Sequence, residues 1–232
     1  MTGSPELVQR ASRWLFDQLP AAAPLWLAGQ RWFGGKTRTI ERVDVGDVVW
    51  LSRDPACALV ILDIRYAIAG TVPAGDRYAT LIALDDHPSG ASTIGCMEGS
   101  LPVFISERST APACLLALVQ VLRGDEAIRG SHGAIVCGDA TDELKRLLSR
   151  DPASAPSVVA IGAEQSNTSV RLGSAHVVKL LRRLDDGENP QLEIGRFLSR
   201  GNFGDTPRLE GSLTYRGTDG RSATLGIVEA WL

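Results

Sequence analysis

A single lysine interrupts the apolar stretch Ala175–Leu181, and this feature constrains the fold more than any other in the chain. The stretch reads AHVVKLL, which is typical of a buried β-strand. Burial of an unpaired ammonium group costs several kcal/mol, so Lys179 requires an anion close by. The strand must therefore lie where an anionic group can contact Lys179.

The segment that follows supplies an anion on a predicted helix. Asn189 is a good N-cap residue, Pro190 is favoured at the first helical position, and Gly201 is typical of the residue after a helix end. Glu193 is the one carboxylate of this helix and lies one turn in, beside apolar residues that would pack on a sheet. A helix packed on that sheet could point Glu193 at Lys179.

A polar segment precedes the strand that carries the lysine. It reads AEQSNTS and lies between two short apolar stretches, Ser157–Gly162 and Val170–Leu172, that predict strands. It lacks the GxGxxG spacing of protein kinases, but backbone amides and hydroxyl groups in such a loop can hold phosphate oxygens. The candidate phosphate-binding residues are Gln165, Ser166, Asn167, Thr168 and Ser169.

The order of these features suggests one kind of site. A kinase lobe uses strand, loop, strand and helix to aim a lysine at the α- and β-phosphates of ATP. Each residue alone has an ordinary structural explanation, because strand lysines and helix glutamates usually face water and Ser/Asn/Thr clusters usually form turns. Spacing alone leaves both interpretations open.

The first 90 residues predict a separate unit of helix and antiparallel sheet. Residues 5–19 place apolar side chains at helical spacing, behind Ser4 as the N-cap. Three stretches with turns between them predict strands: Ile40–Leu51, Ala58–Ala67 and Asp76–Leu84. A helix followed by antiparallel strands indicates the α+β class. We expect this unit to cover residues 1–90 and a second unit to cover residues 91–232.

Composition and charge exclude several classes of function. The 232 residues carry a formal net charge of −3, so no overall positive field favours nucleic acid or anionic lipid. The four cysteines and three histidines show no metal-ligand spacing, which predicts free cysteines and no metal site. The N-terminus lacks the apolar core of a signal peptide, and we expect a cytoplasmic protein without a membrane span.

Two sets of motifs resemble one known family. The stretches EQSNTS, HVVKLLRRL and GENPQLEIGRFL match the nucleotide-binding lobe of bacterial maltokinases, which are relatives of the aminoglycoside phosphotransferases and of eukaryotic-like kinases. The stretch LAGQRWFGGKTR is similar to the N-terminal cap signature of the same family. The resemblance runs from about Trp26 to Leu232, although residues 85–150 add little to it.

The resemblance implies a fold and an activity. It implies an N-terminal cap domain over residues 1–90, followed by a protein-kinase-like N-lobe with an antiparallel sheet and one αC-type helix. It also implies transfer of a phosphoryl group from ATP, with Mg²⁺, to the anomeric hydroxyl of maltose, which gives maltose 1-phosphate. Within the cap signature, Trp32 and Phe33 would pack the cap onto the lobe.

The resemblance also implies roles for the candidate residues. Lys179 would contact the α- and β-phosphates, Glu193 would orient it, and residues 165–169 would face the phosphates. Glu229 and Trp231, near the end of the chain, would approach the hinge that binds adenine through backbone groups.

The family has a second lobe that supplies the catalytic base, the Mg²⁺ ligands and the sugar pocket, and nothing in this sequence matches it. We therefore expect no catalytic residue in this chain, a truncation at the hinge and no turnover from this part alone. Whether the chain itself is an enzyme stays open. Two alternatives remain: a non-catalytic interaction module that docks a partner such as a trehalose synthase, or part of a kinase for glucosamine or an aminoglycoside.

Overall fold

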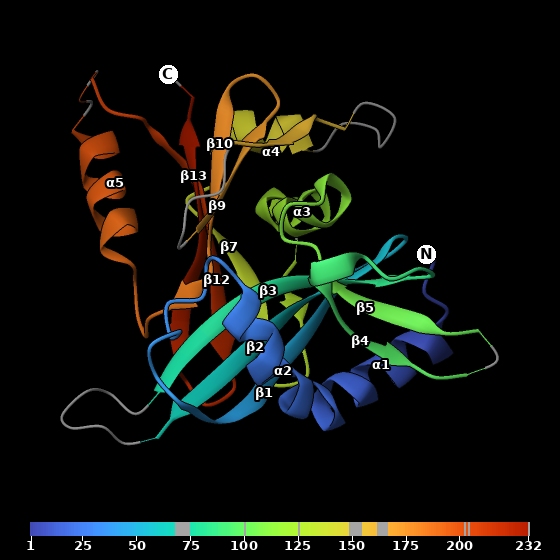
Figure 1. The fold of residues 1–232 in the computed structure, drawn as a ribbon. Helices are drawn as coiled ribbons and strands as arrows, with labels where there is room; N and C mark the ends of the chain where they lie inside the picture. The colour runs from blue at the N-terminus through green and yellow to red at the C-terminus, as the bar shows by residue number, and fades with distance from the viewer. Residues whose placement is uncertain are drawn as a thin grey trace.

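Two antiparallel β-sheets form the framework of the molecule, and helices pack on both of them (Figure 1). The computed structural model describes residues 1–67, 75–99, 101–124, 126–148, 155–161, 167–201, 203 and 205–231. Within these residues the helices are α1 (Pro5–Asp17), α2 (Leu19–Gly29), α3 (Pro112–Val119), α4 (Asp142–Leu148) and α5 (Pro190–Arg200), with 3₁₀ turns at Gly90–Ser92 and Gln120–Arg123. This combination confirms the predicted α+β class.

The first sheet has the strand order β1-β2-β3-β5-β4, and β11 also pairs with β3. Its strands are β1 (Ile40–Arg53), β2 (Ala56–Tyr66), β3 (Gly75–Asp85), β4 (Thr93–Met97), β5 (Val103–Glu107) and β11 (Arg183–Leu184). The three strands predicted from the sequence are present as β1, β2 and β3. Strands β4 and β5 follow residue 90, so this sheet takes in more of the chain than the prediction did.

Helices α1 and α2 cover one face of the first sheet (Figure 1). The predicted first helix is confirmed, and Ser4 Oγ caps it by accepting a hydrogen bond from Leu7 N at 3.1 Å. Leu15 of α1 and Leu27 of α2 are buried here. They pack with every second residue of β2, namely Val60, Leu62 and Ile64.

The second sheet has the strand order β6-β7-β12-β13-β10-β9-β8. Its strands are β6 (Ile128–Arg129), β7 (Gly133–Gly138), β8 (Val158–Ala160), β9 (Asn167–Leu172), β10 (His176–Leu181), β12 (Leu209–Gly217) and β13 (Ser222–Ala230). One face packs against the first sheet and α3 in a shared core. That core includes Leu59 and Ile61 of β2, Leu115 and Leu118 of α3, and Val178 and Leu180 of β10.

A buried carboxylate joins the two sheets. Asp47 of β1 is 0% exposed, and its Oδ1 accepts hydrogen bonds from Ser131 N at 2.7 Å and His132 N at 2.9 Å. Tyr215 of β12 donates from its hydroxyl group to Asp47 Oδ2 at 2.9 Å. Burial raises the pKa of Tyr215, and the hydrogen bond to Asp47 raises it further. These bonds fix the end of the second sheet to β1.

Helix α5 lies on the face of the second sheet opposite α3 (Figure 1). Its N-cap is Asn189, whose Oδ1 accepts a hydrogen bond from Gln191 N at 2.8 Å, as the sequence predicts. Leu192 is buried against Leu209 of β12 and Ile227 of β13. This small apolar contact sets which side of the helix meets the sheet.

Candidate functional site

Lys179 lies in the middle of β10 and faces the side of α5. Its neighbours Val178 and Leu180 are buried in the shared core, so alternation places the lysine on the opposite face of the strand. In the register of the sheet, Lys179 stands opposite Ser169 of β9 and Ile227 of β13. The side chain is 27% exposed, so its ammonium group lies in a partly open site.

The partner of this ammonium group is Glu229 of β13. Lys179 Nζ lies 2.8 Å from Glu229 Oε2, and Gln191 of α5 donates from Nε2 to Glu229 Oε1 at 3.4 Å. Glu229 stands opposite Val177, which makes it a diagonal neighbour of Lys179 on the same face. The site therefore brings together β10, β13 and the first turn of α5.

Among the described residues, the ion pair of Lys179 is with Glu229 and not with Glu193. Leu192 is buried against the sheet, and successive residues of a helix point about 100° apart, so Glu193 is exposed. Gln191, rather than Glu193, is the residue of the first turn that reaches the site. A role for Glu193 in orienting the lysine stays a prediction.

The five candidate phosphate-binding residues fall into three groups. Gln165 and Ser166 lie outside the described residues. Asn167 and Ser169 share the face of the lysine in the register of β9 with β10. Thr168 is buried on the other face. Two of the five candidates are thus placed beside the lysine.

Ser169 holds a buried hydroxyl group without a hydrogen-bond partner. The residue is 6% exposed, and no donor or acceptor in the described part of the chain pairs with its Oγ. Buried hydroxyl groups are almost always hydrogen-bonded, so an unpartnered one marks a place where a ligand or a water can bind. This hydroxyl group stands opposite Lys179. A cation and an unused donor on one face suit an anionic ligand.

The end of β13 is the predicted hinge. Trp231 is 46% exposed, and its backbone N–H donates to Ala175 O at 2.8 Å, which continues the pairing of β10 with β13. Leu232 lies outside the described residues. The adenine contacts expected of Glu229 and Trp231 stay predictions.

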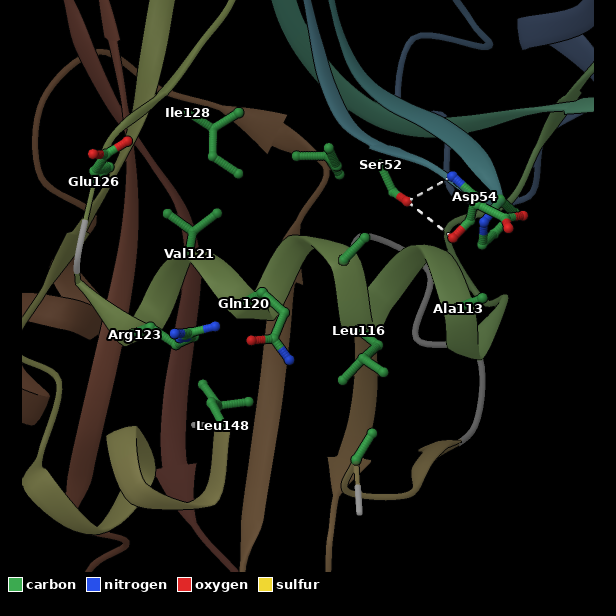
Figure 2. A pocket seen from close by; sticks show the side chains of 14 residues that line it. Ser52, Asp54, Ala113, Leu116, Gln120, Val121, Arg123, Glu126, Ile128 and Leu148 are labelled. Atoms are coloured by element: carbon green, nitrogen blue, oxygen red, sulfur yellow. Dashed lines mark hydrogen bonds between the residues drawn. The ribbon is translucent and has the colours of Figure 1, made fainter. Parts of the chain in front are cut away.

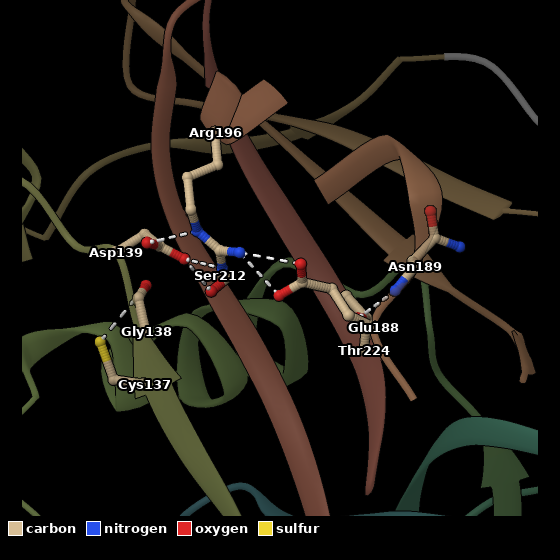
Figure 3. Close-up of polar contacts among 8 residues, drawn as sticks. All are labelled: Cys137, Gly138, Asp139, Glu188, Asn189, Arg196, Ser212 and Thr224. Atoms are coloured by element: carbon tan, nitrogen blue, oxygen red, sulfur yellow. Dashed lines mark hydrogen bonds and ion pairs between the residues drawn. The ribbon is translucent and has the colours of Figure 1, made fainter. Parts of the chain in front are cut away.

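An arginine fixes α5 over the sheet through a network of ion pairs (Figure 3). Arg196 donates to both carboxylate oxygens of Asp139, from Nε at 3.0 Å and from Nη2 at 2.7 Å, and from Nη1 to Glu188 at 2.8 Å. Ser212 of β12 donates from Oγ to Asp139 Oδ2 at 3.1 Å. The Arg196 guanidinium holds the pKa of Asp139 below its usual range. Sequence reasoning missed this network, which sets the position of α5.

The cap signature contacts β3 and the residue that follows β10. The centres of the Trp32 ring and the Tyr78 ring of β3 lie 5.8 Å apart. The guanidinium carbon of Arg182 lies 4.6 Å from the centre of the Trp32 ring. Trp32 therefore contacts a residue of the second predicted unit, and its role in packing a cap onto a lobe stays a prediction. Phe33 packs on Tyr78 at 5.3 Å and is buried in the core between α1, α2 and the first sheet. Phe33 thus packs within the first unit, and it contacts Tyr78, which Trp32 also contacts.

A pocket of 610 Å³ lies beside α3 (Figure 2). Its walls come from the turn between β1 and β2, from α3 and the 3₁₀ turn after it, and from the end of α4; Ser52, Leu116, Gln120 and Leu148 are four of the lining residues. None of the described residues that line it belongs to β9, β10 or β13. The pocket is therefore separate from the lysine site.

No group of three or more His, Cys, Asp or Glu side chains in the described ranges could hold a metal ion. Over the same ranges, the helices are too short or too polar to cross a membrane. The four cysteines are free thiols; Cys57 and Cys114 are buried, and Cys96 and Cys137 are partly buried.

Part of the chain matches a known protein family. Residues 26–102 match the maltokinase N-terminal cap domain family. The matched part contains the LAGQRWFGGKTR signature and strands β1 to β4. The resemblance seen in the sequence of the first unit is thus confirmed.

Two solved structures of a glucosamine kinase share the fold. The complex with glucosamine, ADP and inorganic phosphate aligns with a TM-score of 0.53 and 19% identity over 94% of this chain. The structure in crystal form A aligns with a TM-score of 0.52 and 20% identity over 95% of this chain. The chain spans 41% of the length of each of these kinases. It therefore shares the fold of one part of these kinases.

Proposed function

We propose that this chain is the cap and nucleotide-binding part of an ATP-dependent sugar kinase that converts maltose to maltose 1-phosphate. One observation carries the proposal: Lys179 and the unpartnered hydroxyl group of Ser169 stand opposite each other on one face of the second sheet. A cation beside an unused donor suits a phosphate group. The match of residues 26–102 to a maltokinase cap favours a sugar kinase and favours maltose as the acceptor.

In this proposal ATP supplies the phosphoryl group, and the second sheet holds its phosphates. Lys179 binds the α- and β-phosphates when its ammonium group leaves Glu229. The residues that face the phosphates are Gln165, Ser166, Asn167 and Ser169. The backbone at Glu229 and Trp231 approaches the adenine. Because Glu193 is exposed here, it orients Lys179 only if α5 turns or shifts when the nucleotide binds.

The remaining chemistry is assigned to a second lobe. Phosphoryl transfer depends on positioning and on neutralisation of charge by metal ions. The described residues hold no cluster of metal ligands, and the glucosamine kinases are more than twice as long as the part that this chain matches. We propose that a second lobe supplies the base, most of the Mg²⁺ ligands and the sugar pocket. The chain alone then binds nucleotide but does not catalyse phosphoryl transfer. We place the protein in the cytoplasm.

We also propose a division into a cap over residues 1–90 and an N-lobe over residues 91–232. The units are not independent in structure, because the sheet of the cap takes β4, β5 and β11 from the second unit. The match to the cap family likewise extends to residue 102.

Titration of the chain with ADP in a calorimeter tests the nucleotide site. We expect binding that weakens about tenfold or more in Lys179→Ala, because a charge-assisted contact with phosphate is lost. Lys145→Ala is the matched control, since Lys145 lies on α4, which is outside the site. Equal affinity of the two variants would contradict the assignment of Lys179. No binding by the unaltered chain would favour the alternative of an interaction module, for instance one that docks a trehalose synthase.

The shared fold favours one second candidate for the acceptor. The kinases that share the fold act, by name, on glucosamine, so an amino sugar is the alternative to maltose. A screen of maltose, glucosamine and an aminoglycoside on a polypeptide with both lobes separates the two. Phosphorylation of glucosamine in preference to maltose would overturn the proposed acceptor and leave the nucleotide site intact.

A further inference from the structure

Arg182, the residue that follows β10, joins the second sheet to the first. The residue is 5% exposed. Its Nη1 donates to Glu107 Oε1 at 3.0 Å, at the end of β5, and its Nε donates to Thr168 Oγ1 at 2.9 Å, in β9. The guanidinium group also lies over the Trp32 ring. One side chain therefore contacts both sheets and the cap signature.

The backbone at this residue makes a second connection. Ala79 N of β3 donates to Arg182 O at 2.7 Å, and the chain then continues into β11, which pairs with β3. The strand that carries the lysine thus passes directly into the first sheet. The hairpin of β9 and β10 is attached to the first sheet at this end by both side chain and backbone.

Both strands that Arg182 contacts also carry the candidate site. Thr168 directly precedes Ser169 in β9, and Lys179 lies three residues before Arg182. Alternation puts the contacts of the arginine on one face of the hairpin and the two site residues on the other. If β9 or β10 shifts where Arg182 holds it, the distance between Ser169 and Lys179 on the opposite face of the hairpin therefore changes as well.

We infer that Arg182 is a positioning residue for the nucleotide site. By holding Thr168 and Glu107 together, it fixes the hairpin against the first sheet and sets the spacing of Ser169 Oγ and Lys179 Nζ. The inference rests on the function proposed above. Arginine suits this role because its planar guanidinium group donates in several fixed directions, which the point charge of a lysine does not match.

The double variant R182M/E107Q tests the inference. It removes both charges together, so no unpaired carboxylate is left buried. R42M is the matched control, because Arg42 makes its ion pair with Asp44 on the exposed side of β1. The affinity for ADP and the rates of backbone amide exchange are measured for the unaltered chain and both variants, well below their unfolding temperatures.

We expect the affinity of R182M/E107Q for ADP to fall by roughly threefold to thirtyfold, as for residues that couple to a site without touching the ligand. Amide exchange in residues 167–181 should become faster, with β12 and β13 unchanged and with R42M like the unaltered chain. R182K should preserve folding but not restore the affinity.

Unchanged affinity together with unchanged exchange in the hairpin would overturn the inference. If the unaltered chain does not bind ADP, the proposed function fails, and amide exchange alone decides the role of Arg182. If R182M/E107Q does not fold, T168V takes its place, because it removes one acceptor and leaves the ion pair with Glu107 intact. Normal exchange in the hairpin of T168V would then count against the inference.

Discussion

Lys179 Nζ lies 2.8 Å from Glu229 Oε2, and the two residues are diagonal neighbours on β10 and β13. The carboxylate neutralises an ammonium group that would otherwise be partly buried without a partner. A phosphate group that binds Lys179 must therefore compete with Glu229. Substitution of Glu229 is therefore a direct test of whether Lys179 binds phosphate.

Removal of the competing charge should strengthen nucleotide binding. In Glu229→Gln the amide oxygen can still accept from Gln191, but the negative charge is gone. We expect the Kd for ADP to fall by up to roughly fivefold, because a partly exposed ion pair contributes up to about 1 kcal/mol. Calorimetric titration measures this. A weaker affinity would show that the Glu229 carboxylate itself helps to bind the nucleotide.

Ser169→Ala should separate binding from stability. Its hydroxyl group has no partner among the described residues, so its loss should not lower the free energy of unfolding. The affinity for ADP should fall about tenfold, because a hydrogen bond to a charged group contributes ~1.5 kcal/mol.

Ser212→Ala is the matched control for that measurement. It removes a hydrogen bond to Asp139 and should lower the free energy of unfolding by about 1 kcal/mol, with no change in affinity. Normal ADP binding by Ser169→Ala would remove Ser169 from the site.

Asp47→Ala should weaken the junction of the two sheets. It leaves the amides of Ser131 and His132 and the hydroxyl group of Tyr215 without their acceptor. We expect the free energy of unfolding in urea to fall by about 3 kcal/mol, because buried unpaired donors are strongly unfavourable. Asp44→Ala, on the same strand but in an exposed ion pair, should change it little. An equal loss in both variants would contradict the role of Asp47.

The contact of Asp139 with Arg196 predicts a pH dependence of stability. Because the pKa of Asp139 is lower in the folded than in the unfolded chain, its contribution is complete above about pH 4 and is lost as the pH falls through the folded value. Asp139→Asn is the suitable variant, since asparagine tolerates the φ of 53° at this position.

The unfolding temperatures of both proteins, followed from neutral pH to about pH 2, check this prediction. The difference between them should be largest above about pH 4 and should shrink below it. A difference that stays constant over the whole range would show that the charge of Asp139 does not contribute.

Local signals were sufficient to predict the lysine strand and the helix after it. Asn189 and Pro190 define the start of α5, and alternation along β10 gives the face of Lys179. The same signals could not identify Glu229 as the partner of Lys179. Its place depends on which strand pairs with β10 and in which register, and a pattern of period two does not specify the neighbouring strand.

The polar contacts between distant segments could not be predicted for another reason. Asp47 and Tyr215 are 168 positions apart, and Asp139 and Arg196 are 57 positions apart. Asp47 accepts four hydrogen bonds, but nothing in the sequence around it distinguishes it from an aspartate that faces water. Its burial is decided by the turn at Ser131 and His132, which is brought to β1 only by the complete fold.

Strand β11 belongs to the first sheet although it follows the lysine strand in the sequence. A polypeptide that stopped after β5 would lack its pairing with Tyr78 and Arg77, and the edge of β3 would be open there. Open sheet edges recruit strands from other chains and promote aggregation. Exchange of the first sheet between related proteins would therefore require β11 to be exchanged as well, because a single cut after β5 leaves that strand behind.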